Sequence, residues 1–324
     1  MFHKAPLFRV SLLLKFLFLF CLFGLFPPAL SQDTLVGEGL AAEHKHNLNV
    51  IKTEHYWHTP SVRPDHSPLV PVTLPLNFER SALSFGELLK VGGVIVGEDE
   101  RQQIEDATNF HWRVYGQLTM SFGDKTCTGT GTLISPWHVL TTGCNLYDPK
   151  TQKWAENIQF HPGRNGDTLL LHPVFCVKKA IFSNWKMGDE KSDMGIIELS
   201  EGIGNQLGWN GLLWGEDAYL SKVDPINVTG YPGDKPIGTM WTDYSKDWNN
   251  IYGSQITYQL SASEGQSGAS TWVRSPKDGP EGFYSLGVHA YGSTSWDGAG
   301  VMNIATRLTQ DKFSALINFI NEKF

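Results

Sequence analysis

The stretch with the greatest capacity for chemistry is S-A-S-E-G-Q-S-G-A-S, residues 261–270, with Ser267 near its centre. A glycine at Gly265 allows the backbone to turn so that its own N–H and that of Ser267 point at one spot. Two such donors form an oxyanion hole, which stabilises negative charge developing on a carbonyl oxygen. Gly268 lets the chain leave without crowding the hydroxyl. Alone the motif is weak, because an ordinary β-turn has the same composition.

Short strands must position this turn. From Val94 onward, apolar and β-branched runs between turn residues predict strands at 113–120, 130–135, 139–142, 194–199, 225–229, 254–260 and 285–290. Helical periodicity is found at the end of the chain, where apolar residues recur at three- and four-residue steps: Phe313, Leu316, Ile317, Ile320 and Phe324. The pattern predicts an all-β fold, a double β-barrel with a C-terminal α-helix on the second barrel.

The first 31 residues have the features of a cleavable signal peptide. Basic residues precede an apolar run from Phe16 to Phe26, and small residues from Ala29 to Ser31 predict cleavage after Ser31. The alternative, a signal anchor, is disfavoured because the run is short for a bilayer span. We therefore expect a secreted or periplasmic protein without a stable membrane anchor, folded in an oxidising compartment.

Residues 32–93 differ in texture from the rest of the chain. They contain five of the eleven histidines, and no period of 2 or 3.6 persists long enough to predict a core. The five are His44, His46, His55, His58 and His66. We expect a pro-segment or linker, and the alternative is a metal site at 44–46 or 55–58. For the protein as a whole we expect no cofactor and no metal.

Charge narrows the class of partner. The formal net charge is −7 and the isoelectric point is about 5.9. Nucleic-acid binding requires a basic face, so this balance excludes that class. We expect a monomer.

Several segments between 94 and 324 resemble, in order, the glutamyl endopeptidase branch of the chymotrypsin-like (trypsin-like) serine proteases. They are V-I-V-G-E-D-E-R from Val94, C-T-G-T-G-T-L-I-S-P-W-H-V-L from Cys127, I-Q-F-H-P-G-R-N-G from Ile158, S-D-M-G-I-I-E-L from Ser192, G-Y-P-G-D-K-P-I-G-T-M-W from Gly230, G-V-H-A-Y-G from Gly287 and A-T-R-L-T from Ala305. The resemblance implies a double six-stranded β-barrel over 94–324, a mature amino terminus at Val94, and a peptide or protein substrate.

The resemblance also implies a catalytic triad in the chain order His, Asp, Ser. Asp193 and Ser267 match the family residue for residue, but the histidine is absent. The family has T-A-x-H-C at this place, where T-T-G-C-N puts Cys144 at the position of the general base and Asn145 at that of its cysteine neighbour. A one-residue deletion would instead align Cys144 with that neighbour, and the histidine would still be missing.

A thiol is a poor substitute for this base. A serine hydroxyl is weakly nucleophilic unless a neighbour accepts its proton, and a thiol beside a carboxylate has a raised pKa. Loss of the histidine in such a unit costs about 10⁶-fold in kcat. Other histidines that could replace it are His138, His161, His172 and His111. Two further alternatives are that Cys144 acts as the nucleophile or as a redox-sensitive thiol.

The resemblance bears on the cysteines as well. After signal cleavage removes Cys21, three remain: Cys127, Cys144 and Cys176. Cys127 and Cys144 fall on strands that pair in this fold, where a disulfide is common. We expect a Cys127–Cys144 bridge, with Cys176 free.

Specificity for glutamate in the family uses a histidine, a hydroxyl residue and the mature α-amino group. His289 matches the histidine, Ser263 adjoins the lost hydroxyl position at Ala262, and Val94 supplies the amino group if the chain is cut after Gly93. Glu264 would place a negative charge near a pocket meant for an acid.

One further motif concerns modification rather than specificity. Asn227-Val-Thr229 is an N-glycosylation sequon, which we expect on a surface turn.

Two function classes remain open. In one, the protein is an inactive or impaired serine endopeptidase homologue, a pseudoprotease that binds peptides or proteins. In the other, it is an active serine endopeptidase that uses an unrecognised base and cleaves, for example, after glutamate.

Overall fold

The computed structural model describes residues 33–39, 47–64, 69, 72–73, 92–223, 225–245, 250–274, 281–293 and 301–321. The expected signal peptide, together with His44, His46, His66 and Phe324, lies outside the described residues. The chain from Asp33 onward forms one compact unit. Within the described part of the chain, no helix combines the length and apolarity needed to cross a bilayer.

The first sheet closes on itself. Strand β13 pairs with both β11 and β14, so that over the described residues six strands form a barrel, and β1 lies on the part of β13 beyond β11. The strands in spatial order are β1 (Leu35–Gly39), β13 (Val174–Phe182), β11 (Glu156–Pro162), β6 (Tyr115–Phe122), β7 (Lys125–Leu133), β8 (His138–Thr141) and β14 (Gly195–Leu199). Gly123, with φ of +65°, supplies the positive φ that the tight β6–β7 turn needs.

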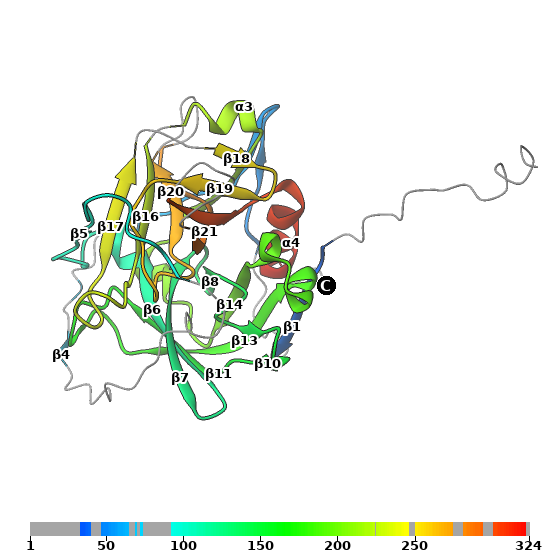
Figure 1. Cartoon of the computed structure of the whole chain (residues 1–324). Coiled ribbons are helices and arrows are strands. Elements are labelled where there is room, and N and C mark those ends of the chain that lie inside the picture. The colour runs from blue at the N-terminus through cyan, green and yellow to red at the C-terminus, as the bar shows by residue number, and fades with distance from the viewer. Residues whose placement is uncertain are drawn as a thin grey trace, which may run out of the picture. The chain divides into compact units, whose positions relative to one another are not determined.

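The second sheet carries the C-terminal half of the chain (Figure 1). Its main path is β18 (Asn250–Tyr252), β19 (Gln255–Tyr258), β22 (Met302–Arg307), β21 (Phe283–Ser293), β20 (Ser270–Arg274), β16 (Ile226–Gly230), β17 (Trp241–Ser245) and β5 (Gln102–Gln103). Strand β15 (Gly211–Gly215) pairs with β21 and with β3 (Tyr56–His58), which pairs in turn with β2 (Ile51–Lys52). Two small ladders join β9 (Tyr147–Asp148) to β10 (Lys153–Trp154) and β12 (Thr168–Leu169) to β4 (Val72–Thr73).

In the described part of the chain the helices are short except near the C-terminus. They are the α-helices α2 (Gly204–Leu207), α3 (Asp217–Leu220) and α4 (Gln310–Ile320), and the 3₁₀ turns η2 (Trp112–Val114), η3 (Ser183–Met187) and η4 (Glu190–Ser192). Thr309 caps α4 by accepting a hydrogen bond from the Lys312 N–H. The predicted apolar face of α4 is buried against β15 and β1, in a cluster that draws side chains from both sheets. The all-β fold and the terminal helix predicted from the sequence are confirmed.

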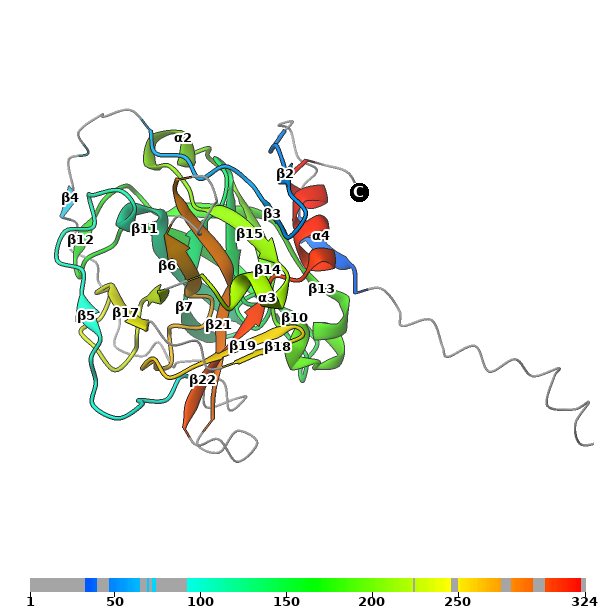
Figure 2. The same ribbon diagram turned by 90° about the horizontal axis from the view of Figure 1, so that it is seen from above.

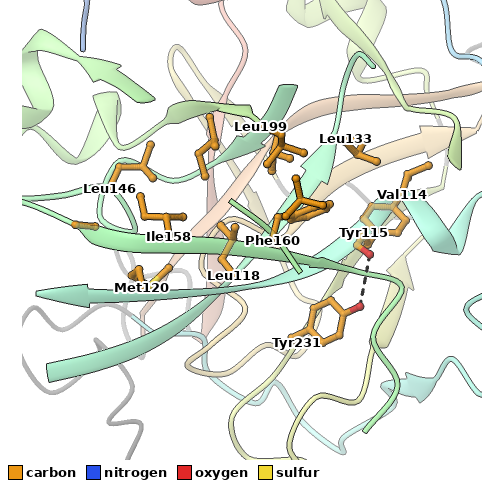
Figure 3. Close-up of a cluster of buried hydrophobic side chains, with 14 of the residues drawn as sticks. Val114, Tyr115, Leu118, Met120, Leu133, Leu146, Ile158, Phe160, Leu199 and Tyr231 are labelled. Atoms are coloured by element: carbon orange, nitrogen blue, oxygen red, sulfur yellow. Dashed lines mark hydrogen bonds between the residues drawn. The ribbon is translucent and has the colours of Figure 1, made fainter. Parts of the chain in front are cut away.

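The core of the barrel continues into the second sheet. Figure 3 shows Leu118, Phe160 and their neighbours filling the barrel interior. Tyr231 enters this cluster from the loop after β16, and its hydroxyl donates to the Tyr115 carbonyl oxygen at 3.5 Å. Trp272 and Tyr291 of the second sheet belong to the same cluster. The seam between the sheets is therefore packed like an interior, and side chains placed there are shielded from water.

The described residues of the expected pro-segment or linker, 33–39 and 47–64, pack against both sheets. Strand β1 pairs with β13 over five residues, and β3 pairs antiparallel with β15. Figure 2 shows β2 and β3 beside β15 and α4. Tyr56 and His58 are buried, and Trp57 packs edge-on against Trp214 with ring centroids 5.2 Å apart. No local pattern predicts this packing, because the strands are short and each is completed by a partner far along the chain.

Polar contacts attach both ends of this segment. The Asp33 carboxylate accepts hydrogen bonds from the Asn184 N–H at 2.9 Å and from the hydroxyls of Ser183 and Ser192. The Leu48 N–H donates to the Asn321 side chain at 2.7 Å, and Val62 exchanges two backbone hydrogen bonds with Trp209. The segment is thus part of the folded unit.

A cut chain tests how firmly the segment is attached. If a specific-protease site is introduced between residues 77 and 91 and cleaved, we expect both pieces to co-elute in size-exclusion chromatography without denaturant. Trp57→Ala, which removes the contact with Trp214, should weaken the complex by about 2 kcal/mol. Elution of the uncoupled N-terminal piece from the cut wild type at micromolar concentration would contradict the prediction.

Candidate active site

The turn at Ser267 has the backbone conformation that its two glycines predict. Gly265 and Gly268 adopt φ of +86° and +88°. A Cβ on Gly268 would lie 2.1 Å from the Thr130 carbonyl oxygen, and one on Gly265 would lie 2.6 Å from the Tyr231 carbonyl oxygen. Glycine is therefore required at both positions by conformation and by space. Ser267 lies between them with 6% of its surface exposed.

The peptide before Gly265 is turned by a hydrogen bond from the neighbouring loop. The Glu264 carbonyl oxygen accepts from the Gly233 N–H at 2.6 Å. Because C=O and N–H point in opposite directions across a trans peptide, the Gly265 N–H is directed away from Gly233. The Gly265 carbonyl oxygen accepts from the Thr130 hydroxyl at 2.9 Å. This arrangement supports the expected role of Gly265 in an oxyanion hole.

A buried guanidinium braces the same loop. The Arg101 side chain is fully buried and paired with Asp99 and Asp234. Its Nη1 also donates to Gln266 Oε1 at 3.2 Å, next to Ser267 in the chain. Charge-assisted hydrogen bonds of this kind fix geometry as well as contributing energy. Sequence reasoning missed this role, although Arg101 and Asp234 both belong to motifs that carried the resemblance.

Asp193 lies just before β14, at the seam between the sheets, with no exposed surface. Its Oδ1 accepts from the Cys144 N–H at 2.7 Å, and its Oδ2 accepts from the Tyr291 hydroxyl at 2.6 Å. Burial raises the pKa of Asp193 to about 6, against the opposing effect of these hydrogen bonds. The carboxylate is thus ionised at neutral pH and held by donors from both sheets.

Cys144 lies between Asp193 and Ser267. Its side chain is completely buried, and the thiol hydrogen-bonds the Thr142 hydroxyl at 3.3 Å. It also interacts with the Asp193 carboxylate and with the Ser267 side chain. Burial, reinforced by the nearby Asp193 charge, raises the pKa of Cys144 well above its ordinary value. The thiol beside Asp193 and Ser267 is therefore neutral.

Asn145 and Cys144 face different parts of the structure. The Asn145 amide donates to the Thr141 hydroxyl at 2.9 Å and to the Ser267 carbonyl oxygen at 2.8 Å, and it packs against Gly129 of β7. Cys144 faces Asp193 instead, which is the contact expected of a residue at the base position.

The expected Cys127–Cys144 disulfide is wrong. Cys127, Cys144 and Cys176 are all free thiols in the structure. The reason is the direction of the side chains: Asn145, not Cys144, faces the strand that carries Cys127. Cys127 itself pairs with Met120 in the β6–β7 hairpin.

The histidines considered as replacement bases have partners elsewhere. The Nδ1 of His138 hydrogen-bonds the Ser135 hydroxyl at 2.7 Å, and its ring lies edge-on to Phe319. His161 bonds the Thr119 hydroxyl, His172 bonds Glu201 at the surface, and His111 stacks on Phe283. These contacts give none of the four a role beside Ser267.

The histidines of the N-terminal segment were considered as a metal site. His55 lies 3.5 Å from Glu216, and His58 is buried against the Thr59 carbonyl oxygen. Within the part of the chain that the structure describes, no group of three His, Cys, Asp or Glu side chains could hold a metal ion.

The candidate specificity residues His289 and Val94 both make hydrogen bonds in the chain before any cleavage at Val94. His289 is buried, its Nδ1 lies 2.6 Å from the Tyr258 hydroxyl, and its Nε2 has no partner among the described residues. Burial lowers the pKa of His289 to about 3, so the imidazole is neutral. Val94 is held by Asn303, which accepts from its N–H at 2.9 Å and donates to its carbonyl oxygen at 2.7 Å.

The other two candidate specificity residues, Ser263 and Glu264, contact other parts of the chain. Ser263 donates to the Asp234 carboxylate and accepts from Arg101. Glu264 approaches Gly92, where an added Cβ would lie 2.8 Å from its Cγ. Ser263 therefore belongs to the Arg101 network in the uncut chain, and Glu264 faces the segment before Val94.

The glycosylation sequon does not lie on a surface turn. Asn227 is in β16, between β17 and β20, and its amide donates to the Pro225 and Trp272 carbonyl oxygens. Thr229 is fully buried. The expected placement was wrong because the sequence Ile-Asn-Val-Thr completes the centre of a sheet.

The pKa of Asp193 predicts a pH-dependent stability. Because the native state holds this proton more tightly than the unfolded chain, the stabilisation is complete only below about pH 3.8 and is lost as the pH rises through about 6. The difference from the ordinary value of 3.8 corresponds to about 3 kcal/mol. Between pH 4 and 7.5 the unfolding free energy of the wild type should therefore fall by up to this amount relative to Asp193→Asn. Urea titrations at several pH values measure it, and a flat difference would contradict it.

Thiol labelling tests the burial of Cys144. In a variant that carries Cys127→Ser and Cys176→Ser, iodoacetamide should modify Cys144 on the order of 100-fold more slowly in the native protein than in guanidinium. In denaturant without reductant, the wild-type Cys127, Cys144 and Cys176 should all react, since none is bridged. Rapid native labelling of Cys144, or a thiol protected until reductant is added, would contradict this picture.

Comparison with known proteins places the chain. No protein-family profile matches it. It is 31% identical over 231 residues to the glutamyl endopeptidase of Bacillus licheniformis, which covers 70% of this chain and 69% of that protein. It is 30% identical over 238 residues to a Bacillus subtilis protein named extracellular metalloprotease, covering 70% of each.

A solved structure, titled as a Glu endopeptidase in complex with MPD, aligns with a TM-score of 0.59 and 20% identity over 71% of this chain and 100% of the other, which supports the fold. With the barrel, the Ser267 turn and the buried Asp193 in place, these relatives show that the chain belongs to the glutamyl endopeptidase family of chymotrypsin-like serine proteases.

Proposed function

We propose that this protein is a secreted pseudoprotease that binds peptides or proteins in the frame of a glutamyl endopeptidase without hydrolysing them. The observation that carries the proposal is the buried neutral thiol of Cys144 between Asp193 and Ser267. Family membership makes a peptide or protein the natural ligand, and relatives that are extracellular proteases support secretion.

The chemical argument rests on proton transfer. For Ser267 to attack a carbonyl carbon, its hydroxyl proton must move to a base as the new C–O bond forms. A neutral thiol has no basic site of useful strength, and the negative charge of Asp193 disfavours the thiolate. Asp193 is ionised at neutral pH, but its two oxygens accept from Cys144 and Tyr291 rather than from Ser267.

The binding elements are better preserved than the catalytic unit. The glycine turn expected to form the oxyanion hole and the buried His289 are present. Nε2 of His289, which has no partner among the described residues, is suited to accept or donate one hydrogen bond to a ligand side chain. A ligand held here would meet a serine hydroxyl with no base to activate it. Peptide capture without turnover is the expected outcome.

The test uses the protein cut between Gly93 and Val94. With a glutamyl-peptide substrate and a fluorophosphonate probe, we expect the wild type to match Ser267→Ala in both turnover and labelling. Fluorescence anisotropy should nevertheless detect binding of a labelled glutamyl peptide, weakened about tenfold in His289→Ala through loss of one hydrogen bond to a charged group.

Each half of the proposal can fail separately. Turnover that disappears in Ser267→Ala would establish an active serine endopeptidase with another base, which is the alternative function. Absence of both turnover and binding would show that the pocket has also lost its role.

A further inference from the structure

Tyr291 is a residue of the site that the sequence did not single out. It lies in β21 with 6% of its surface exposed, and its hydroxyl donates to Asp193 Oδ2 at 2.6 Å. It is close enough to Cys144 for the two side chains to interact electrostatically. Burial raises the pKa of Tyr291 well above its ordinary value, so the hydroxyl remains a donor at neutral pH.

A β-bulge directs this side chain toward Asp193. His289 pairs with Ala305 of β22, whereas Tyr291 pairs with the adjacent Ile304, so one extra residue lies in β21 at Ala290. A bulge breaks the alternation of side chains between the two faces of a sheet and re-aims the residue that follows. Accordingly, His289 contacts Tyr258 within the second sheet, whereas Tyr291 crosses the seam to the first.

The two contacts of Asp193 correspond to those of a working triad. There, the aspartate holds the histidine through its ring Nδ1–H and so fixes the tautomer and the ring orientation. In this protein the Cys144 N–H occupies Oδ1, and the Tyr291 hydroxyl occupies the oxygen that an imidazole N–H would need. Asp193 is fully buried, so water cannot compete for either oxygen.

We propose that Tyr291 is a positioning residue whose hydroxyl occupies the Asp193 oxygen that a catalytic histidine would need. This contact is a second barrier to catalysis, independent of the missing histidine. The inference rests on the proposed loss of hydrolysis and extends it. A histidine introduced at position 144 would have to displace the Tyr291 hydroxyl from Oδ2, and its ring would need space that the completely buried Cys144 side chain does not leave. Repair of the base alone therefore leaves Ser267 unreactive, whereas repair together with removal of Tyr291 does not.

The experiment compares four full-length proteins: wild type, Cys144→His, Tyr291→Ala and the double variant. The primary readout is the low-field proton resonance of an imidazole Nδ1–H bonded to a buried carboxylate. We expect it in the double variant and not in Cys144→His alone. This readout depends on geometry at Asp193, and a purely structural role of Tyr291 would not produce it.

The second readout is phosphonylation of Ser267 by a fluorophosphonate. In this reaction the Ser267 Oγ–P bond forms, fluoride leaves, and the hydroxyl proton passes to the introduced imidazole. The double variant should react at least about 100-fold faster than either single variant, which is the scale of general-base catalysis. Ser267→Ala in the same background gives the blank.

The outcomes separate the two proposals. A resonance in Cys144→His alone, or in neither variant, overturns the role given to Tyr291. Ser267-dependent turnover by the wild type overturns the proposed function instead, and it is seen without any substitution.

A conservative variant guards against misfolding of the double variant. Tyr291→Phe keeps the ring and removes the donor, so the pKa of Asp193 should rise and the pH at which its stabilisation is lost should move upward. An unchanged pH profile in Tyr291→Phe would show that the hydroxyl does not hold Asp193, and the proposal would fail.

Discussion

The centre of this protein depends on a buried carboxylate that must be hydrogen-bonded. Asp193 has no exposed surface and lies where two sheets meet, in surroundings where an ionised group without donors would be very unfavourable. Its donors come from the turn after β8 and from β21, on opposite sides of the seam. The same hydrogen bonds thus stabilise the buried charge and connect the two sheets. The Tyr291 hydroxyl supplies one of these donors.

The backbone of the Ser267 turn is held by a separate set of contacts. The glycines of the Ser267 turn are fixed by contacts with Thr130 and Tyr231, and the loop before Ser267 is braced by Arg101. None of these contacts involves the general base. The backbone geometry at Ser267 therefore does not depend on a general base beside it.

The N-terminal segment adds a related constraint. Because β1 and β3 extend the two sheets and Asp33 binds Ser192 beside Asp193, residues before Val94 contribute to the folded unit. Gly92 and Glu264 meet in the uncut chain, and Val94 is bonded to Asn303. The residues before Val94 are therefore in direct contact with the loop that carries Ser267.

Local features were determined by the sequence alone. Alternation and turn residues located the strands around 130–142, 194–199 and 285–290, and apolar spacing located the helix that begins at Gln310. The motifs identified the Ser267 turn, Asp193 and the absence of the histidine, because these depend on residue types a few positions apart. Only the tertiary structure decided where side chains point across long distances. The bulge at Ala290 turns Tyr291 onto Asp193, and Asn145 rather than Cys144 faces Cys127's strand, which precludes the expected disulfide. Likewise β1 pairs with β13, more than 130 residues away, and one of the two strands that flank Asn227 is β20, more than 40 residues away. Such contacts are set by packing between elements, which a local pattern of residues does not specify.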